Sequence, residues 1–98
     1  MSYVLGPHAR QALEDIYAHI LPDDARAAER AIDRILQSCD TLARFPMIGR
    51  TGRVEGTREF SISNVRYFVV YEMNDDVVRV LDVIRTSRNW PYADPPGG

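Results

Sequence analysis

Arginine is the residue type in this chain with the clearest potential for binding chemistry. All twelve cationic side chains are arginine, and the second half of the sequence is rich in them. A guanidinium group can bind phosphate or carboxylate through two parallel hydrogen bonds, which lysine cannot do. Codon bias is the favoured explanation for the absence of lysine, but it does not explain the clustering. The clustered residues are Arg44, Arg50, Arg53, Arg58, Arg66, Arg79, Arg85 and Arg88.

Glycines and arginines are interspersed in residues 45–60, FPMIGRTGRVEGTREF, a stretch that could be taken for a phosphate-binding loop. Such a loop follows a strand and leads into a helix whose N-terminus faces the anion. Here the order is reversed, because a helical pattern precedes the stretch and a strand-like pattern follows it. We therefore interpret Gly49, Gly52 and Gly56 as turn residues that tolerate positive φ, in a joint between a helical half and a sheet.

Conventional catalytic or metal-binding groups are hard to identify. His8 and His19 lie in the helical half, and neither has a metal-ligand spacing relative to Cys39, which fits an apolar helical stripe as a core residue. Arginine stays protonated and is a poor general base, so catalysis by the arginines would depend on electrostatic stabilisation. The sequence predicts no metal site and no cofactor.

Composition predicts one small cytoplasmic domain. The 98 residues are 45% hydrophobic, which suits a single thin core, expected over residues 1–92 with a flexible tail at 93–98. A single cysteine excludes an internal disulfide and suits a reducing compartment. No apolar run is long enough for a membrane span, and no signal peptide is evident. The net charge of -2 argues against a broadly basic nucleic-acid binder.

The first half predicts a short strand followed by two antiparallel helices. The strand covers residues 2–5, and Pro7 suits the first turn of the first helix. Asp23 or Asp24 caps the second helix, which Phe45-Pro46 terminates. Apolar residues at helical spacing give each helix one buried face. In the first helix these are Ala9, Leu13, Ile16, Tyr17 and Ile20.

The second half changes to the two-residue period of strands. Residues 58–63, 65–73 and 77–85 predict a three-stranded antiparallel meander, with a tight turn at 74–76. On the middle strand, Tyr67, Val69, Tyr71 and Met73 share the face expected to pack on the helices. Arg66, Phe68, Val70 and Glu72 share the other face, which we expect to be a recessed surface for a partner. The fold class is α+β, in the order βααβββ.

Four motifs in this order resemble the RelE/ParE toxin superfamily over nearly the whole chain. They are Phe45-Pro46 with Gly49-Arg50, then Thr57-Arg58-Glu59-Phe60, then Tyr67-Phe68-Val69-Val70-Tyr71, and then Val83-Ile84-Arg85-Thr86-Ser87-Arg88-Asn89-Trp90. The resemblance implies a toxin of a bacterial type II toxin–antitoxin operon, neutralised by a cognate antitoxin. Members of the superfamily either poison DNA gyrase or cleave mRNA on the ribosome.

The chain is more similar to the ParE branch, which implies gyrase as the target. Its helices form a ParE-like hairpin, and Phe68 stands where both branches often have arginine. Arg66, two residues earlier, could partly compensate. Arg85 replaces the histidine that usually precedes the terminal Gly-x-Arg, and Thr86 replaces the glycine. A RelE-like mRNA endonuclease and a non-toxic binding module derived from a toxin are the alternatives.

The resemblance also implies site residues. Target binding is expected at Arg58, Arg85, Arg88 and Trp90, which would form a single cationic cluster, whereas Arg53 and Arg79 are expected to be solvated. If the chain is a nuclease, the catalytic residues would be Arg58, Arg66, Arg85, Arg88 and Tyr92. Antitoxin binding is expected at Leu13, Ile16, Ile20, Phe68 and Val70.

Overall fold

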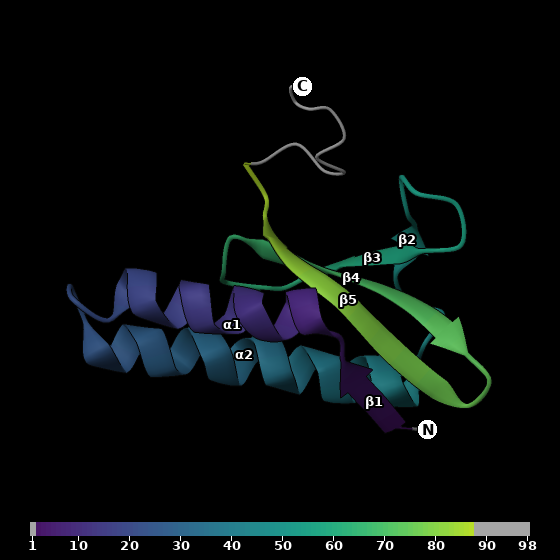
Figure 1. Ribbon diagram of the computed structural model, residues 1–98, viewed down its shortest axis with the longest axis horizontal. Helices are drawn as coiled ribbons and strands as arrows, with labels where there is room; N and C mark the ends of the chain where they lie inside the picture. Colours follow the sequence, from purple (N-terminus) through teal and green to yellow (C-terminus); the bar gives the residue numbers. More distant parts are fainter. Residues whose placement is uncertain (1, 88–98) are drawn as a thin grey trace.

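A helical hairpin packs against one face of a five-stranded sheet (Figure 1). The computed structural model describes residues 2–87, and the strand order in the sheet is β1-β5-β4-β3-β2. The elements are β1 (Ser2–Leu5), α1 (Pro7–Ile20), α2 (Ala25–Arg44), β2 (Arg50–Thr51), β3 (Arg58–Ser61), β4 (Tyr67–Asn74) and β5 (Val77–Arg85). The predicted α+β class and the helical hairpin are confirmed.

Local sequence explains where the helices begin and end. Pro7 opens α1, where its missing N–H is no loss. The Asp24 carboxylate accepts hydrogen bonds from the backbone N–H groups of Arg26 (3.0 Å) and Ala27 (3.1 Å), so Asp24 is the cap of α2. The helix ends at Arg44, because Pro46 disfavours helical backbone at the preceding residue.

The sheet contains more than the predicted meander. Strands β3, β4 and β5 pair antiparallel as expected, and β1 joins them by pairing parallel to β5. The Gly6 N–H donates to the Val80 carbonyl at 2.8 Å, which ties the start of α1 to the same strand. The two-residue strand β2, not predicted, pairs with β3 at the opposite edge.

The main core lies between the helices and the sheet. Val69 and Tyr71 are fully buried on the helix-facing side of β4, as predicted from the alternation. Cys39 is fully buried among the apolar residues of α2, which confirms its interpretation as a core residue. Met73 is 41% exposed, so the core ends before the tip of the β4–β5 hairpin.

The other face of the sheet differs from the prediction. Phe68 and Val70 are only 3% and 0% exposed and pack with Ile84 in a second, smaller apolar cluster. The guanidinium of Arg53 lies 5.2 Å from the centroid of the Phe68 ring, a cation–π arrangement. The expectation of an accessible, recessed apolar surface on this face is therefore wrong, although a role for these residues in antitoxin binding is untested.

Four of the predicted features lie outside the described residues. These are Arg88, Trp90, Tyr92 and the tail expected at 93–98. Within residues 2–87, no helix has the length and apolarity needed to cross a membrane. The same residues contain no cluster of three or more histidine, cysteine, aspartate or glutamate side chains placed to hold a metal ion.

Candidate functional site

Residues 45–60 are a joint, as predicted, and Tyr71 holds its first part against the sheet. The Tyr71 hydroxyl accepts a hydrogen bond from the Gly49 N–H at 3.0 Å and donates one to the Pro46 carbonyl at 2.7 Å. Nη1 of Arg58 donates to the Gly49 carbonyl at 2.6 Å. Arg58 and the buried Tyr71 therefore fix the exit from α2, a structural role that the sequence does not reveal.

The glycines of the joint are needed for two different reasons. Only Gly56 has a positive φ, +86°, as predicted for a turn residue. The prediction of positive φ is wrong for Gly49 and Gly52, where close packing excludes a side chain instead. A Cβ on Gly49 would lie 2.8 Å from Cε1 of Tyr71, and one on Gly52 would lie 2.9 Å from the Thr57 carbonyl oxygen.

Glu59 organises the remaining arginines of the joint. Its side chain is 1% exposed and forms ion pairs with Arg50 (2.8 Å) and Arg53 (3.4 Å), and it also accepts the backbone N–H of Arg53 at 2.9 Å. Burial acts to raise the pKa of Glu59, but the Arg53 N–H and the two guanidinium groups together lower it below its usual value. The Arg53 side chain is 43% exposed, so it is solvated as predicted, but it is also paired with Glu59, which was not predicted.

The structure does not bring Arg58 beside Arg85. Both residues lie on the helix-facing side of the sheet, since Arg58 is the register partner of Tyr71 and Arg85 that of Tyr67. These partners are four residues apart along β4, on the order of 13 Å, and β3 and β5 flank β4 on opposite sides. Among the described residues, the predicted target-binding arginines therefore occupy two separate places.

Arg85 and Arg66 instead belong to an open pocket between α2 and the start of β4. Its volume is about 740 Å³, and Arg30 and Arg34 line its α2 side. We call this the cationic pocket. Arg66 precedes β4 in the turn that contains Asn64, whose φ is +67°. Arg66 lines this pocket together with Tyr67 and lies outside β4, so the prediction that it shares a strand face with Phe68 is wrong.

The four arginines of the cationic pocket have no acidic counterpart in the part of the chain that is described. No aspartate or glutamate lines the pocket, and none of the three ion pairs found in residues 2–87 involves these arginines. Four positive charges thus converge in a protein whose net charge is -2. Such a concentration of like charge attracts an anionic ligand.

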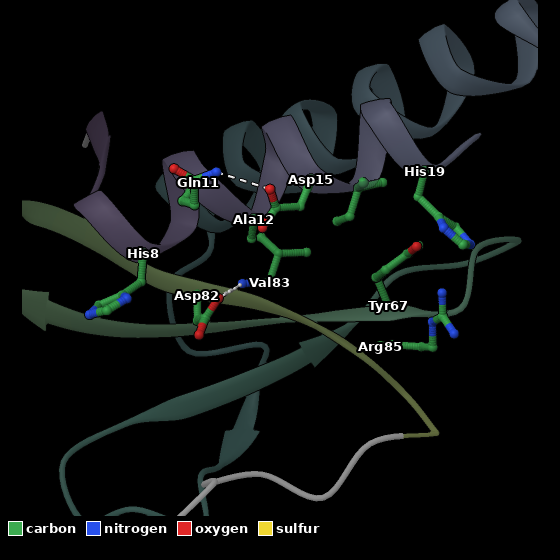
Figure 2. A pocket seen from close by; sticks show the side chains of 10 residues that line it. His8, Gln11, Ala12, Asp15, His19, Tyr67, Asp82, Val83 and Arg85 are labelled. Atoms are coloured by element: carbon green, nitrogen blue, oxygen red, sulfur yellow. Dashed lines mark hydrogen bonds between the residues drawn. The ribbon is translucent and has the colours of Figure 1, made fainter. Parts of the chain in front are cut away.

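A second pocket, of about 400 Å³, adjoins the cationic pocket along α1 and shares Tyr67 and Arg85 with it. We call it the polar pocket. Figure 2 shows His8 and Asp82 at one end of it and His19, Tyr67 and Arg85 at the other.

Asp82 and Asp15 place acidic groups in the polar pocket. Burial raises the pKa of Asp82, while the Val83 N–H, at 2.8 Å, and His8 act in the opposite direction. Asp15 accepts a hydrogen bond from Nε2 of Gln11 at 2.9 Å. The two pockets therefore form one groove that is cationic at one end and polar with acidic groups at the other.

The residues predicted to bind the antitoxin contribute to the groove unequally. On α1, Ile16 is 7% exposed and lines the polar pocket, whereas the half-buried Ile20 lines the cationic pocket. Leu13 packs on the main core and lines neither pocket. Arg30 and Arg34 were missed, although their spacing of four residues on an amphipathic helix placed them on one face.

Known proteins similar to this chain include bacterial toxins. Residues 3–90 match a family model described as the ParE toxin of the type II toxin–antitoxin system parDE. A protein of Sinorhizobium fredii named "Putative toxin Y4kP" is 37% identical over 83 residues, which are 85% of each chain. A solved structure titled "Chromosomal ParDE TA system from P. aeruginosa" has the same fold, with a TM-score of 0.78 at 20% identity, covering 87% of this chain and 95% of that one. This chain therefore belongs to the ParE toxin family of type II toxin–antitoxin systems.

Proposed function

We propose that this ParE-family toxin acts in the bacterial cytoplasm by inhibiting DNA gyrase, and that a cognate antitoxin neutralises it. The observation that carries the proposal is the match of residues 3–90 to the ParE toxin family. Type II systems pair such a toxin with an antitoxin, and the groove along α1 and α2 is the surface we assign to partner recognition.

The arrangement of the arginines supports gyrase inhibition over mRNA cleavage. A ribonuclease must stabilise charge that develops at one phosphodiester, and it needs several donors at that point. Arg58 donates to the Gly49 carbonyl and lies away from Arg85. Phe68, at a position where relatives often have arginine, is buried. Of the arginines named for the nuclease alternative, only Arg66 and Arg85 share a pocket in the described part of the chain.

The proposal is tested with the purified chain in two assays run side by side. We expect it to inhibit supercoiling of relaxed plasmid by gyrase, and to leave the yield of a reconstituted translation reaction unchanged. The antitoxin encoded beside the gene should restore supercoiling when added in equimolar amount. Ribosome-dependent cleavage of mRNA, with gyrase unaffected, would replace the proposal by the endonuclease alternative. If neither assay responds, the chain is a binding module without toxicity.

A further inference from the structure

We propose that the cationic pocket binds a purine nucleoside polyphosphate. The arginines of the pocket hold the phosphate groups, and the base lies against the apolar side chains beside Tyr67. The pocket volume of about 740 Å³ is within the range of about 300–1,000 Å³ that is usual for small-molecule sites. This inference goes beyond the proposed function and does not depend on the target of the toxin.

The charge of the cationic pocket favours an anion that carries several charges close together. Arg30 and Arg34 are one helical turn apart on α2, and Arg66 and Arg85 line the pocket from the sheet side. All four are exposed, and no ion pair within residues 2–87 engages them. A guanidinium group binds phosphate through two parallel hydrogen bonds. A chain of two or three phosphate groups can therefore bind several of these arginines at once.

The backbone fixes the sheet side of the cationic pocket before any ligand binds. The Thr86 N–H donates to the Arg66 carbonyl at 2.9 Å, which joins the start of β4 to the end of β5. Arg85 is the register partner of Tyr67, and Figure 2 shows their side chains at the same end of the neighbouring polar pocket. Because these residues are already held together, binding requires less ordering of the chain.

The apolar part of the lining favours a nucleotide over inorganic phosphate or polyphosphate. It is formed by Ile20, Ala27 and Ala31 from the helices and by Val65 and Tyr67 from the sheet side. An inorganic anion would leave these side chains in contact with water. A base can stack on an aromatic ring or pack against aliphatic groups while the phosphates reach the arginines. A purine offers the larger flat surface for this contact.

The polar pocket favours a single nucleotide over a nucleic-acid strand. A strand that continued along the groove would carry its phosphates past Asp15 and Asp82, which line the polar pocket. A nucleic acid has a negative charge at every nucleotide, so it cannot avoid this repulsion. A single nucleotide stays within the cationic pocket. There Asn64, Thr86 and Ser87 provide amide and hydroxyl groups that suit hydrogen bonding to a ribose.

Isothermal titration calorimetry with the purified full chain in magnesium-free buffer tests the inference. The probes are ATP, GTP, inorganic tripolyphosphate, adenosine, a peptide of four glutamates and a tetrathymidylate. We expect ATP or GTP to bind at least about tenfold more tightly than each of the other four probes, because only these two combine a polyphosphate with a purine.

Variants of the toxin locate the binding site. The double charge reversal Arg30→Glu with Arg34→Glu should weaken binding of the preferred purine nucleotide about thirty-fold. The matched control is Arg10→Glu with Arg44→Glu, which makes the same charge change at exposed helical positions outside the cationic pocket. It should change affinity less than about threefold. Thermal melting of each variant establishes that the fold is retained.

A third variant tests the contact with the base. Tyr67→Leu keeps an apolar side chain but removes the aromatic ring, so it should weaken binding of the purine nucleotide about fivefold. Binding of tripolyphosphate should change less than about twofold, because the arginines remain. Equal losses for the two ligands would contradict the placement of the base beside Tyr67.

Four further results would overturn the inference. They are tripolyphosphate binding as tightly as the nucleotides, the glutamate peptide binding as tightly, tighter binding of the tetrathymidylate, and equal losses in the two double variants. A gyrase assay on the same preparation tests the other proposal. If the toxin inhibits gyrase but does not prefer a purine nucleotide, only this inference fails. If it prefers the nucleotide but leaves gyrase active, only the assigned target fails.

Discussion

At the scale of single residues, Glu59 shows how a charged side chain can serve the fold. It lies on the face of the sheet opposite the helices, because it is the register partner of Val70. There its carboxylate is buried and holds Arg50 and Arg53. The pairing places Arg53 over Phe68, so the small second cluster is covered by a side chain that Glu59 positions. Removal of the negative charge should therefore weaken the attachment of β2 and of the loop after it, and also the contact of Arg53 with the Phe68 ring.

Replacement of Glu59 by glutamine should lower the free energy of unfolding by about 1–3 kcal/mol at neutral pH, because hydrogen bonds to a buried charge are lost. The pKa of Glu59 is lower in the folded chain than its usual value of 4.5. The stabilisation is therefore fully present above that value and is lost as the pH falls through the lowered pKa. When urea unfolding is measured from about pH 7 to about pH 3, the free energy of unfolding of the parent should approach that of the Glu59→Gln variant as the pH falls.

The control for this measurement is Glu55→Gln, which removes the same charge from an exposed position in the same loop. It should change the free energy of unfolding by less than about 0.5 kcal/mol. A difference between parent and Glu59→Gln that stays constant from neutral to acid pH would mean that the carboxylate does not stabilise the fold through its charge.

At the scale of elements, the second helix has the clearest local determinant. The sequence offers Asp23 and Asp24 as caps, and both are exposed. Only Asp24 accepts hydrogen bonds from the first turn of α2 within the described residues. The backbone of Asp24 is extended, with φ −160° and ψ 104°, which aims its side chain at those N–H groups. The cap thereby fixes the point at which the hairpin loop ends.

Replacement of Asp24 by alanine should destabilise the protein by about 1 kcal/mol, because two N–H groups of α2 lose their acceptor. Asp23→Ala is the matched control and should be close to neutral, since it removes an equal charge one residue earlier. Urea unfolding followed by circular dichroism measures both. Equal losses in the two variants would show that the stabilisation comes from negative charge near the helix N-terminus and not from the hydrogen bonds.

The sequence predicted elements better than contacts between them. The helices and β5 were predicted closely, because apolar periodicity and proline are local signals. The pairing of β1 with β5 was not predicted, because it joins residues near the two ends of the described chain and no local signal reports it. The same limit applies to the site. Arg66 and Arg85 were identified, but their convergence with Arg30 and Arg34 depends on how α2 crosses the sheet.

At the scale of the whole molecule, Cys39 reports on the integrity of the main core. Its side chain is fully buried between α2 and the sheet. Burial, and to a smaller extent the nearby Asp40, raise the pKa of the thiol to about 12. The reactive form is the thiolate, so the folded protein should resist thiol reagents at ordinary pH. Exposure of this group requires α2 to separate from the sheet.

Reaction of Cys39 with a chromogenic disulfide should therefore be on the order of a thousandfold slower in the folded chain than in denaturant, as expected for a small domain of ordinary stability. A partner that binds only the folded state should slow the reaction further. Absorbance at a fixed reagent concentration follows the rate. Reaction within tenfold of the denatured rate would mean that α2 opens locally without global unfolding.

The parallel pairing of β1 with β5 has a consequence for how the toxin is made. Leu5 leaves the ribosome 72 residues before Val77, the first residue of the strand beside it. At about 5–20 residues per second, β1 waits roughly 4–14 s for its neighbour to be synthesised. Until then the helical hairpin has no complete sheet to cover its apolar face. The complete sheet is thus unavailable to any chain that ends before β5, because β1 then lacks the strand with which it pairs.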